Sequence, residues 1–413
     1  MNGHDAYAVL RVGVYRRFLA FRLFTTIAVQ MQGLIVGWQV YELTKDPLAL
    51  GLIGLAEAIP NILTALFAGH AADRYNRKGI ILLFSALFLA GTLLLYLFSL
   101  RPQLFLSGPG VLPIYVVVMI SGISRAFLYP SIIALMATLI PRKLYVNAST
   151  WNSTTWHVAA ITGPAAGGLI YGFFGVEVAY LSVILMLLIA MTLIVFVRGR
   201  PTPPVMAGET LLQRLSSGFR FVFKNQILLG GMSLDMLAML FGGALAMLPV
   251  FAAEVLMVGP QGLGFLRAAP MAGAVAMSLV LAHRPPRARA GRYLLAGVAG
   301  FGLCMICFAL SQNYYLSLAL LILSGMFDNI SVIVRNTAMQ LITPDNMRGR
   351  VAAVNAIFVG SSNEVGSFES GVAARLMGLV PSVVFGGAVT LAAVGIMAKV
   401  APKLRRLNLG EVR

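Results

Sequence analysis

The sequence predicts an all-α integral membrane protein with twelve transmembrane helices in two pseudo-symmetric six-helix bundles. Three observations support this fold class: the composition is apolar, apolar segments of spanning length recur along the chain, and the two halves repeat each other. Of the 413 residues, 59% are hydrophobic and 11% are charged, against about 25% charged residues in a typical soluble protein. Disorder requires low hydrophobicity, and a disulfide scaffold requires more than the two cysteines present, so both classes are excluded.

Each predicted span contains roughly 20 mostly apolar residues, which is the length needed to cross a bilayer. The twelve predicted spans are 18–43, 48–70, 79–100, 112–140, 147–173, 177–197, 226–256, 261–282, 293–311, 314–342, 350–374 and 381–400. Little of the chain is left for a soluble domain, so activity is expected within the bilayer. The spans divide into an N-terminal bundle (1–197) and a C-terminal bundle (226–413), joined by a cytosolic linker (198–225).

The linker changes character along its length. It opens with three prolines, which disfavour helix: Pro201, Pro203 and Pro204. It continues with apolar residues that share one helix face: Leu211, Leu215, Phe219 and Val222. This pattern predicts an amphipathic helix on the inner leaflet, with an ordinary solvated connector as the alternative.

The basic residues responsible for the net charge of +17 lie mostly in the predicted loops and termini. Basic residues gather in the N-terminal tail, the linker, the C-terminus and alternate loops, whereas the opposite side has Lys45, Arg101 and Arg375. By the positive-inside rule, both termini are cytosolic. Nothing in the sequence resembles a nucleic-acid-binding module, so we expect no nucleic-acid partner.

Glycines and prolines reveal the internal repeat. A shift of 210 residues aligns Gly54 with Gly264 and Pro60 with Pro270, and a shift of 203 residues aligns Gly122 with Gly325, Gly163 with Gly366, and Gly168 with Gly371. Two parallel six-helix halves predict a substrate path between them, near the bilayer midplane.

Ionisable residues inside the spans are the main candidates for function. They are Arg22, Glu57, Arg125, Asp235, Arg267, Asp328, Arg335, Glu364 and Glu369. Each costs ~2.5–3.5 kcal/mol at the centre of a spanning helix, so such groups pair with one another or face water. A role in transport is one hypothesis, and static ion pairs that hold helices together are the alternative.

The repeat places opposite charges at equivalent positions. Arg125 aligns with Asp328, and Glu57 aligns with Arg267. We therefore expect Arg125 and Asp328 to approach each other across the central cavity, with Arg335 on the same helix face as Asp328. Protonation of such a carboxylate would release its arginine and couple proton binding to substrate binding.

The carboxylates differ in their suitability as proton carriers. Asp328 is the first candidate, followed by Asp235, Glu369 and Glu364. Arg125 and Arg335 would attract an anionic or polar substrate group or tune the carboxylate, and Arg22, Glu57 and Arg267 are further cavity charges. A sodium site built from Asn363 and its neighbouring serines is the alternative.

The loop after the second span resembles a signature of the major facilitator superfamily. It reads Gly69-His70-Ala71-Ala72-Asp73-Arg74-Tyr75-Asn76-Arg77-Lys78, against the superfamily's G-x-L-A-D-R-x-G-R-K. It departs at Ala71 and at Asn76, where asparagine can replace glycine in a left-handed turn. The resemblance implies that Gly69, Asp73, Arg74, Arg77 and Lys78 form a cytosolic gating loop.

The fifth span resembles the antiporter motif of the same superfamily, G-x-x-x-G-P-x-x-G-G, with Ala159 in place of the first glycine. The matching residues are Gly163, Pro164, Gly167 and Gly168. Segments 215–221 and 343–351 are similar to the enterobactin-exporter and drug-exporter branch. The resemblance implies export rather than uptake, although close helix packing alone also favours small residues.

We therefore expect a secondary active transporter in the cytoplasmic (inner) membrane, working as a monomer by alternating access. The expected activity is proton-coupled export of a small amphipathic molecule such as a siderophore or drug. The alternatives are uptake, or transport of a lipid-like substrate, by symport or facilitated diffusion. A polytopic membrane enzyme would need a nucleophile–base pair or a metal site, and the spans suggest neither, so no enzyme activity, cofactor or metal is expected.

Overall fold

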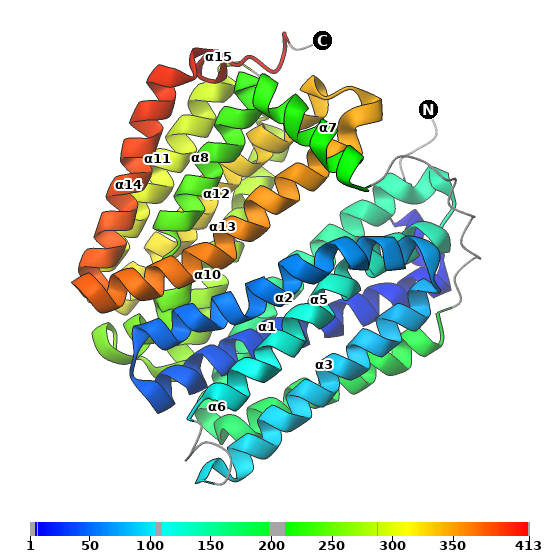
Figure 1. Ribbon diagram of the computed structural model, residues 1–413, viewed down its shortest axis with the longest axis vertical. Helices are drawn as coiled ribbons and strands as arrows, with labels where there is room; N and C mark the ends of the chain where they lie inside the picture. The colour runs from blue at the N-terminus through cyan, green and yellow to red at the C-terminus, as the bar shows by residue number, and fades with distance from the viewer. Residues whose placement is uncertain (1–4, 6, 104–109, 198–210, 287, 412–413) are drawn as a thin grey trace. The chain divides into compact units, whose positions relative to one another are not determined.

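The computed structural model describes residues 5, 7–103, 110–197, 211–286 and 288–411. These residues are almost entirely helical, and none of them forms a strand. The helices are drawn in Figure 1: α1 (Gly13–Thr44), α2 (Pro47–Arg74), α3 (Arg77–Leu100), α5 (Leu112–Leu139), α6 (Tyr145–Val195), α7 (Leu211–Lys224), α8 (Gln226–Gly242), α9 (Leu248–Val250), α10 (Gly259–His283), α11 (Ala290–Leu310), α12 (Tyr314–Ile342), α13 (Arg348–Met377), α14 (Leu379–Val400) and α15 (Pro402–Arg405).

The predicted fold class is confirmed, since ten helical segments among the described residues are long and apolar enough to span a membrane. Two differences explain why ten segments are found where twelve spans were predicted. The predicted fifth and sixth spans form one continuous segment, α6, and α13 is not among the ten. Residues 361–370 of α13 contain serines, an asparagine and two glutamates, which make this helix polar. The count of twelve stays a prediction.

Gly175 breaks α6 in the middle. Its φ of 87° and ψ of 176° belong to a region that is open essentially to glycine alone. On either side of the break, Tyr171 and Tyr180 reach the same end of α1. Tyr171 donates a hydrogen bond to Glu42 at 2.7 Å, and Tyr180 donates one to Gln39 at 2.6 Å.

The two ends of α6 also meet, at the other end of α1. Tyr15 donates a hydrogen bond to the carbonyl of Ala148 at 2.6 Å, and both residues share a buried cluster with Phe18 and Ile194. The helix therefore folds back at Gly175 into two antiparallel halves along α1. These halves correspond to the predicted fifth and sixth spans.

The described chain forms two compact units. Unit 1 consists of α1, α2 from Ala56 onward, α3, α5, α6 and the start of α10, Gly259–Ala268. Unit 2 consists of Asp46–Leu55, α7 to α9, α10 from Ala269 onward, and α11 to α15. Each unit thus includes a short helical stretch that the sequence assigns to the other half. The division of the chain at 198–225 stays a prediction.

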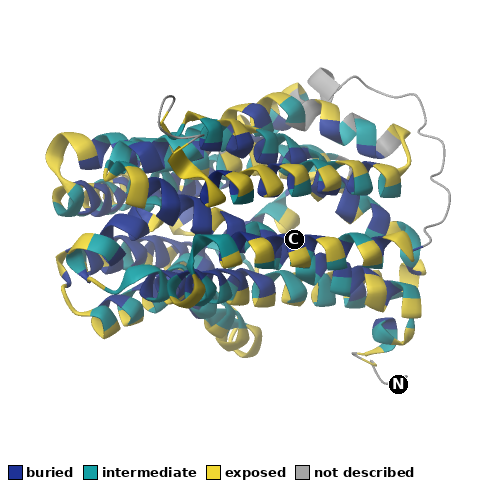
Figure 2. Cartoon of the chain, turned by 90° about the horizontal axis from the view of Figure 1, so that it is seen from below, coloured by how far each residue is buried: buried dark blue, intermediate teal, exposed yellow. Residues whose placement is uncertain are grey.

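Buried and exposed residues occupy different faces along the helices (Figure 2). Large apolar side chains are exposed at many positions, including Phe67, Leu83 and Leu279, which are 63–70% exposed. Exposed apolar surface of this extent marks an interface with an apolar partner, and for helices of spanning length that partner is the lipid bilayer.

The helix α7 is the described part of the linker, whose prolines lie outside the described residues. Val222 is fully buried and packs with residues of α8 and α13, namely Leu228, Met232, Val351 and Val354. Arg350 of α13 donates a hydrogen bond to Ser217 of α7 at 3.0 Å. The described part of the apolar face predicted to lie on the inner leaflet is therefore occupied by the protein itself.

Candidate functional site

A charge pair joins α2 and α5 in unit 1. Arg125 forms an ion pair with Glu57, and both side chains are partly exposed. Gly122, one turn before Arg125, permits this approach because a methyl group there would lie 2.5 Å from the carbonyl oxygen of Glu57. Close contact of the two helix backbones thus brings the guanidinium within reach of the carboxylate.

The repeat partner of Gly122 has the same role in unit 2. A methyl group at Gly325 would overlap the carbonyl oxygen of Pro270 on α10. Asp328 follows Gly325 by three residues, as Arg125 follows Gly122. Both glycines therefore allow their helix to contact a backbone carbonyl of a neighbouring helix, and the two carbonyls differ by one helical turn in the repeat alignment.

A second charge in unit 1, Arg22 of α1, has a different environment. It is 7% exposed, and its guanidinium carbon lies 5.8 Å from the centroid of the Tyr129 ring on α5. None of the salt bridges formed between described residues includes Arg22, and its Nε atom is buried without a hydrogen-bond partner.

Unit 2 contains a cluster of three charges on α8 and α12. Asp235 and Arg335 form an ion pair and are 5% and 6% exposed. Asp328, half-buried and two turns before Arg335 on α12, interacts electrostatically with both. One carboxylate therefore pairs with the guanidinium inside a helix bundle, and a second lies within electrostatic range of both. Uptake of a single proton by this cluster changes its net charge from −1 to zero.

The predicted approach of Arg125 to Asp328 links residues of different units and stays a prediction. Within its own unit, each of the two has an oppositely charged neighbour. The sequence could not identify Glu57 as the neighbour of Arg125, because Glu57 lies on another helix. Arg335 lies on the same helix as Asp328, and the sequence places it on the same face.

The remaining candidate charges are Arg267, Glu364 and Glu369. Arg267 donates a hydrogen bond to the carbonyl of Gly33 at 3.2 Å. Glu364 and Glu369 are half-buried on α13, five residues apart and thus about 140° apart around the helix. Among the described residues, no group of three His, Cys, Asp or Glu is arranged to hold a metal ion.

The gating loop is tied to neighbouring helices by its basic residues. Arg77 donates hydrogen bonds to the carbonyls of Ala72 and Ala134, both at 3.1 Å, and Lys78 donates one to the carbonyl of Val195 at 2.5 Å. These bonds join the start of α3 to the ends of α2, α5 and α6.

Asn76 does not adopt the left-handed turn expected from the motif. Its φ is −63°, and its side chain accepts hydrogen bonds from the backbone amides of Lys78 and Gly79, so it caps the N-terminus of α3. Gly69 has open space around it, and the side chain of Asp73 lies outside the described ones. The gating role of this loop, including Arg74, stays a prediction.

The antiporter-motif glycines are packing positions. Methyl groups at Gly163 and Gly167 would lie 2.7 Å from Gln30 and 3.3 Å from Met31 of α1, and one at Gly168 would lie 2.7 Å from Gly264 of α10. Pro164 lies within α6 without breaking it. The motif therefore brings α6 close to two neighbouring helices in unit 1.

A similar glycine contact occurs in unit 2, one helical turn from the position that the repeat alignment gives. A methyl group at Gly371 of α13 would lie 2.8 Å from Gly51 of α2, and Arg375 of α13 forms an ion pair with Asp46 at 3.4 Å. These contacts explain why Asp46–Leu55 belongs to unit 2.

A buried polar network in unit 1 was not predicted from the sequence. Gln32 of α1 donates a hydrogen bond to Ser121 of α5 at 3.2 Å and accepts one from Thr92 of α3 at 2.6 Å. Single polar residues in three separate spans were its only signal, and only packing brings them together.

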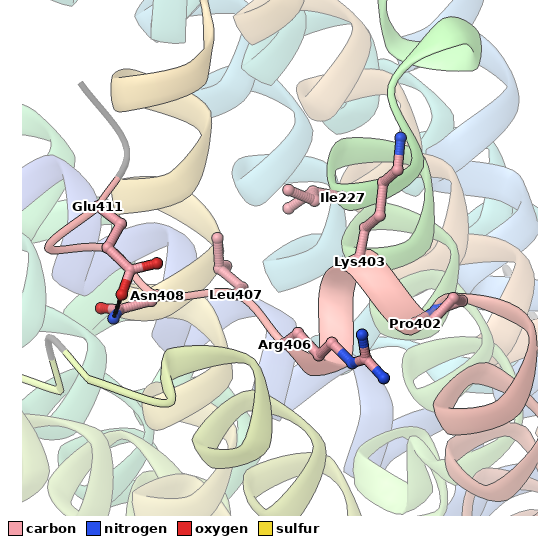
Figure 3. Close-up of a pocket in the computed structure, with 7 residues that line it drawn as sticks. All are labelled: Ile227, Pro402, Lys403, Arg406, Leu407, Asn408 and Glu411. Atoms are coloured by element: carbon pink, nitrogen blue, oxygen red, sulfur yellow. Dashed lines mark hydrogen bonds between the residues drawn. The ribbon is translucent and has the colours of Figure 1, made fainter.

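A pocket of about 410 Å³ lies at the start of α8 in unit 2, beside the C-terminal segment (Figure 3). Its lining includes Ile227, Lys403 and Arg406, and Asn408 at its edge donates a hydrogen bond to Glu411 at 2.6 Å. The pocket shares no lining residue with the charge clusters of α8 and α12, so it is not part of the candidate site.

Comparison with known proteins finds relatives that are named as exporters. The chain is 26% identical to "Enterobactin exporter EntS" of Shigella dysenteriae serotype 1 (strain Sd197) over 337 residues, which cover 82% of this chain and 79% of the relative. The same figures hold for the exporter of that name in Escherichia coli O139:H28 (strain E24377A / ETEC).

Solved structures share the fold at low identity. A bacterial homologue of the human lysosomal transporter Spinster superposes with a TM-score of 0.72 at 14% identity, covering 98% of this chain and 97% of that one. A D-xylose-proton symporter superposes with a TM-score of 0.73 at 15% identity, covering 97% and 100%. The family model described as "Transmembrane secretion effector" matches residues 4–410, and the chain therefore belongs to this family of major facilitator superfamily transporters.

Proposed function

We propose that this chain exports a small amphipathic molecule, such as a siderophore or a drug, by proton-coupled antiport with alternating access. The observation that carries the proposal is the cluster of Asp235, Arg335 and Asp328. Two carboxylates beside one guanidinium have one uncompensated negative charge, and charge inside a bilayer is costly. Protonation removes that charge, so the two protonation states favour different exposure of the cluster to water.

Asp328 is the proposed proton carrier. It is half-buried, whereas Asp235 is buried in its ion pair with Arg335, so Asp328 can exchange a proton with less disruption of packing. Asp235 is the second candidate, and Glu369 and Glu364 follow because neither belongs to this cluster. The direction is supported by the relatives named as exporters, and enterobactin is the first substrate to test.

The proposed setting is the inner membrane, with both termini in the cytosol and the protein acting as a monomer. Close packing at Gly163, Gly167 and Gly168 is proposed to support the rocking motion, and the loop with Arg74, Arg77 and Lys78 is proposed to close the cytosolic side.

The test uses purified protein in liposomes with an imposed pH gradient and a pH-sensitive dye inside. Enterobactin and ethidium serve as the siderophore and drug probes. Wild type should move protons when one of these substrates is added on the opposite side, and Asp328→Asn should abolish this movement while still binding the substrate. The matched control is Asp345→Asn, which makes the same change at a side chain that is 88% exposed.

Two results would overturn the proposal. Substrate flux without proton flux would exclude proton coupling. Unchanged coupled flux in Asp328→Asn would assign the carrier to another carboxylate, and Asp235→Asn is the next variant to measure.

A further inference from the structure

Arg22 is a buried cation whose charge no described residue balances. The residue is 7% exposed, and no acidic side chain in the described part of unit 1 forms an ion pair with it. Burial of an unpaired charge is strongly unfavourable, so a structure that keeps one generally uses it.

Two other arginines within the spans, Arg125 and Arg335, differ in this respect. Arg125 pairs with Glu57, and Arg335 pairs with Asp235 beside Asp328. The sequence suggested Arg125 and Arg335 as the attractors of an anionic substrate. Because their own carboxylates already compensate them, Arg22 is better suited to that role.

Thr25 and Tyr129 are neighbours of Arg22. Thr25 follows Arg22 by one helical turn on α1, is 4% exposed, and its Oγ1 atom also lacks a hydrogen-bond partner among the described residues. On the other side, the Tyr129 ring lies 5.8 Å from the guanidinium carbon and is 59% exposed. Buried polar atoms without partners are rare in folded proteins and call for water or a ligand.

We propose that Arg22, with Thr25 and Tyr129, is the subsite that binds an anionic oxygen group of the exported molecule, such as a carboxylate. The guanidinium supplies charge and directional donors, the hydroxyl of Thr25 supplies a further donor, and the ring of Tyr129 provides an apolar surface for the body of an amphipathic molecule. The inference rests on the proposed export function and narrows its substrates to anionic amphipathic molecules.

The test is a binding measurement on the full chain in lipid nanodiscs. The probe is 2-naphthoate, an aromatic carboxylate, and its uncharged methyl ester is the matched ligand. We expect naphthoate to raise the unfolding temperature of the wild type in a concentration-dependent way, because a ligand that binds only the folded state stabilises it. The ester should cause no such rise.

Three variants locate the effect. Arg22→Gln should weaken naphthoate binding by at least about tenfold, the usual scale for loss of a charged hydrogen bond. Arg22→Lys keeps the charge and should retain part of the affinity. Arg142→Gln removes an exposed arginine of the loop before α6 and should bind as the wild type does.

A structural role for Arg22 gives a different result. If the arginine only holds α1 to α5, Arg22→Gln lowers the unfolding temperature without ligand and leaves the naphthoate affinity unchanged. We expect the unliganded variant to unfold at the same or a higher temperature than the wild type, because a buried charge that no described residue balances has been removed.

The proposal is overturned if naphthoate fails to stabilise the wild type, or if Arg22→Gln or the ester binds as well as the wild type binds naphthoate. Binding in nanodiscs requires no pH gradient. If naphthoate does not bind, the proposed proton transport through Asp328 is therefore not refuted. If proton coupling is not found, naphthoate binding is still expected.

Discussion

The Gly122→Ala substitution should destabilise unit 1 by a predictable amount. The added methyl group would lie 2.5 Å from the carbonyl oxygen of Glu57, whereas real Cβ contacts essentially never fall below 3.0 Å. The backbones of α2 and α5 must therefore separate by about 0.5 Å. Overpacking of this kind costs ~1–3 kcal/mol, and the helix propensity of alanine returns at most ~1 kcal/mol. The expected net loss relative to the wild type is therefore about 0–2 kcal/mol, and relative to alanine at an unconstrained helical glycine it is ~1–3 kcal/mol.

The control is Gly360→Ala on α13, where nothing lies within 4 Å of the added methyl group. This variant should be neutral or more stable by up to ~1 kcal/mol. The assay is unfolding of both variants in mixed micelles by denaturant titration, followed by circular dichroism. Equal stability of the two variants would refute the reasoning that backbone contact at Gly122 sets the distance between α2 and α5.

Four other substitutions test the charge cluster, the break in α6 and a buried hydrogen bond by the same unfolding assay. Arg335→Met should lower the free energy of unfolding by ~3–5 kcal/mol, because two carboxylates lose their cation. Asp235→Asn should lower it by less, because a second carboxylate remains beside the arginine, and equal losses would contradict this arrangement. Gly175→Ala should cost ~1–3 kcal/mol because its φ of 87° strains an L-residue, and an unaffected variant would show that the turn is not constrained. Tyr180→Phe should cost ~1–3 kcal/mol because Gln39 loses a buried donor at 2.6 Å; no loss would indicate that another donor replaces it.

The sequence determined the fold class and the positions of the candidate charges. Apolar segments of spanning length predict helices in a bilayer without any knowledge of contacts, because the backbone must satisfy its own hydrogen bonds there. The repeat also predicted which glycines are equivalent. Gly122 and Gly325 each bring a helix backbone against a carbonyl of a neighbouring helix, although the two carbonyls, of Glu57 and Pro270, differ by one helical turn in the repeat alignment.

Only the tertiary structure shows which charged side chains pair with one another. Arg125 and Arg335 have similar sequence environments to Arg22, yet only the first two meet a carboxylate in the described structure. Side-chain pairing depends on how helices that are distant in sequence pack, and spacing along one helix does not contain that information. The same reason explains why the sequence did not predict that Phe219 and Val222 of α7 pack with residues of α8 and α13.

The sequence also could not predict how the chain turns at Gly175 within α6. The hydropathy pattern shows two apolar segments around position 175, and it correctly predicted two antiparallel halves. It could not predict that a single glycine with positive φ would reverse the chain with no intervening loop. The hydrogen bonds of Tyr171 and Tyr180 to acceptors at one end of α1 flank this turn, and such contacts exist only once the helices have packed.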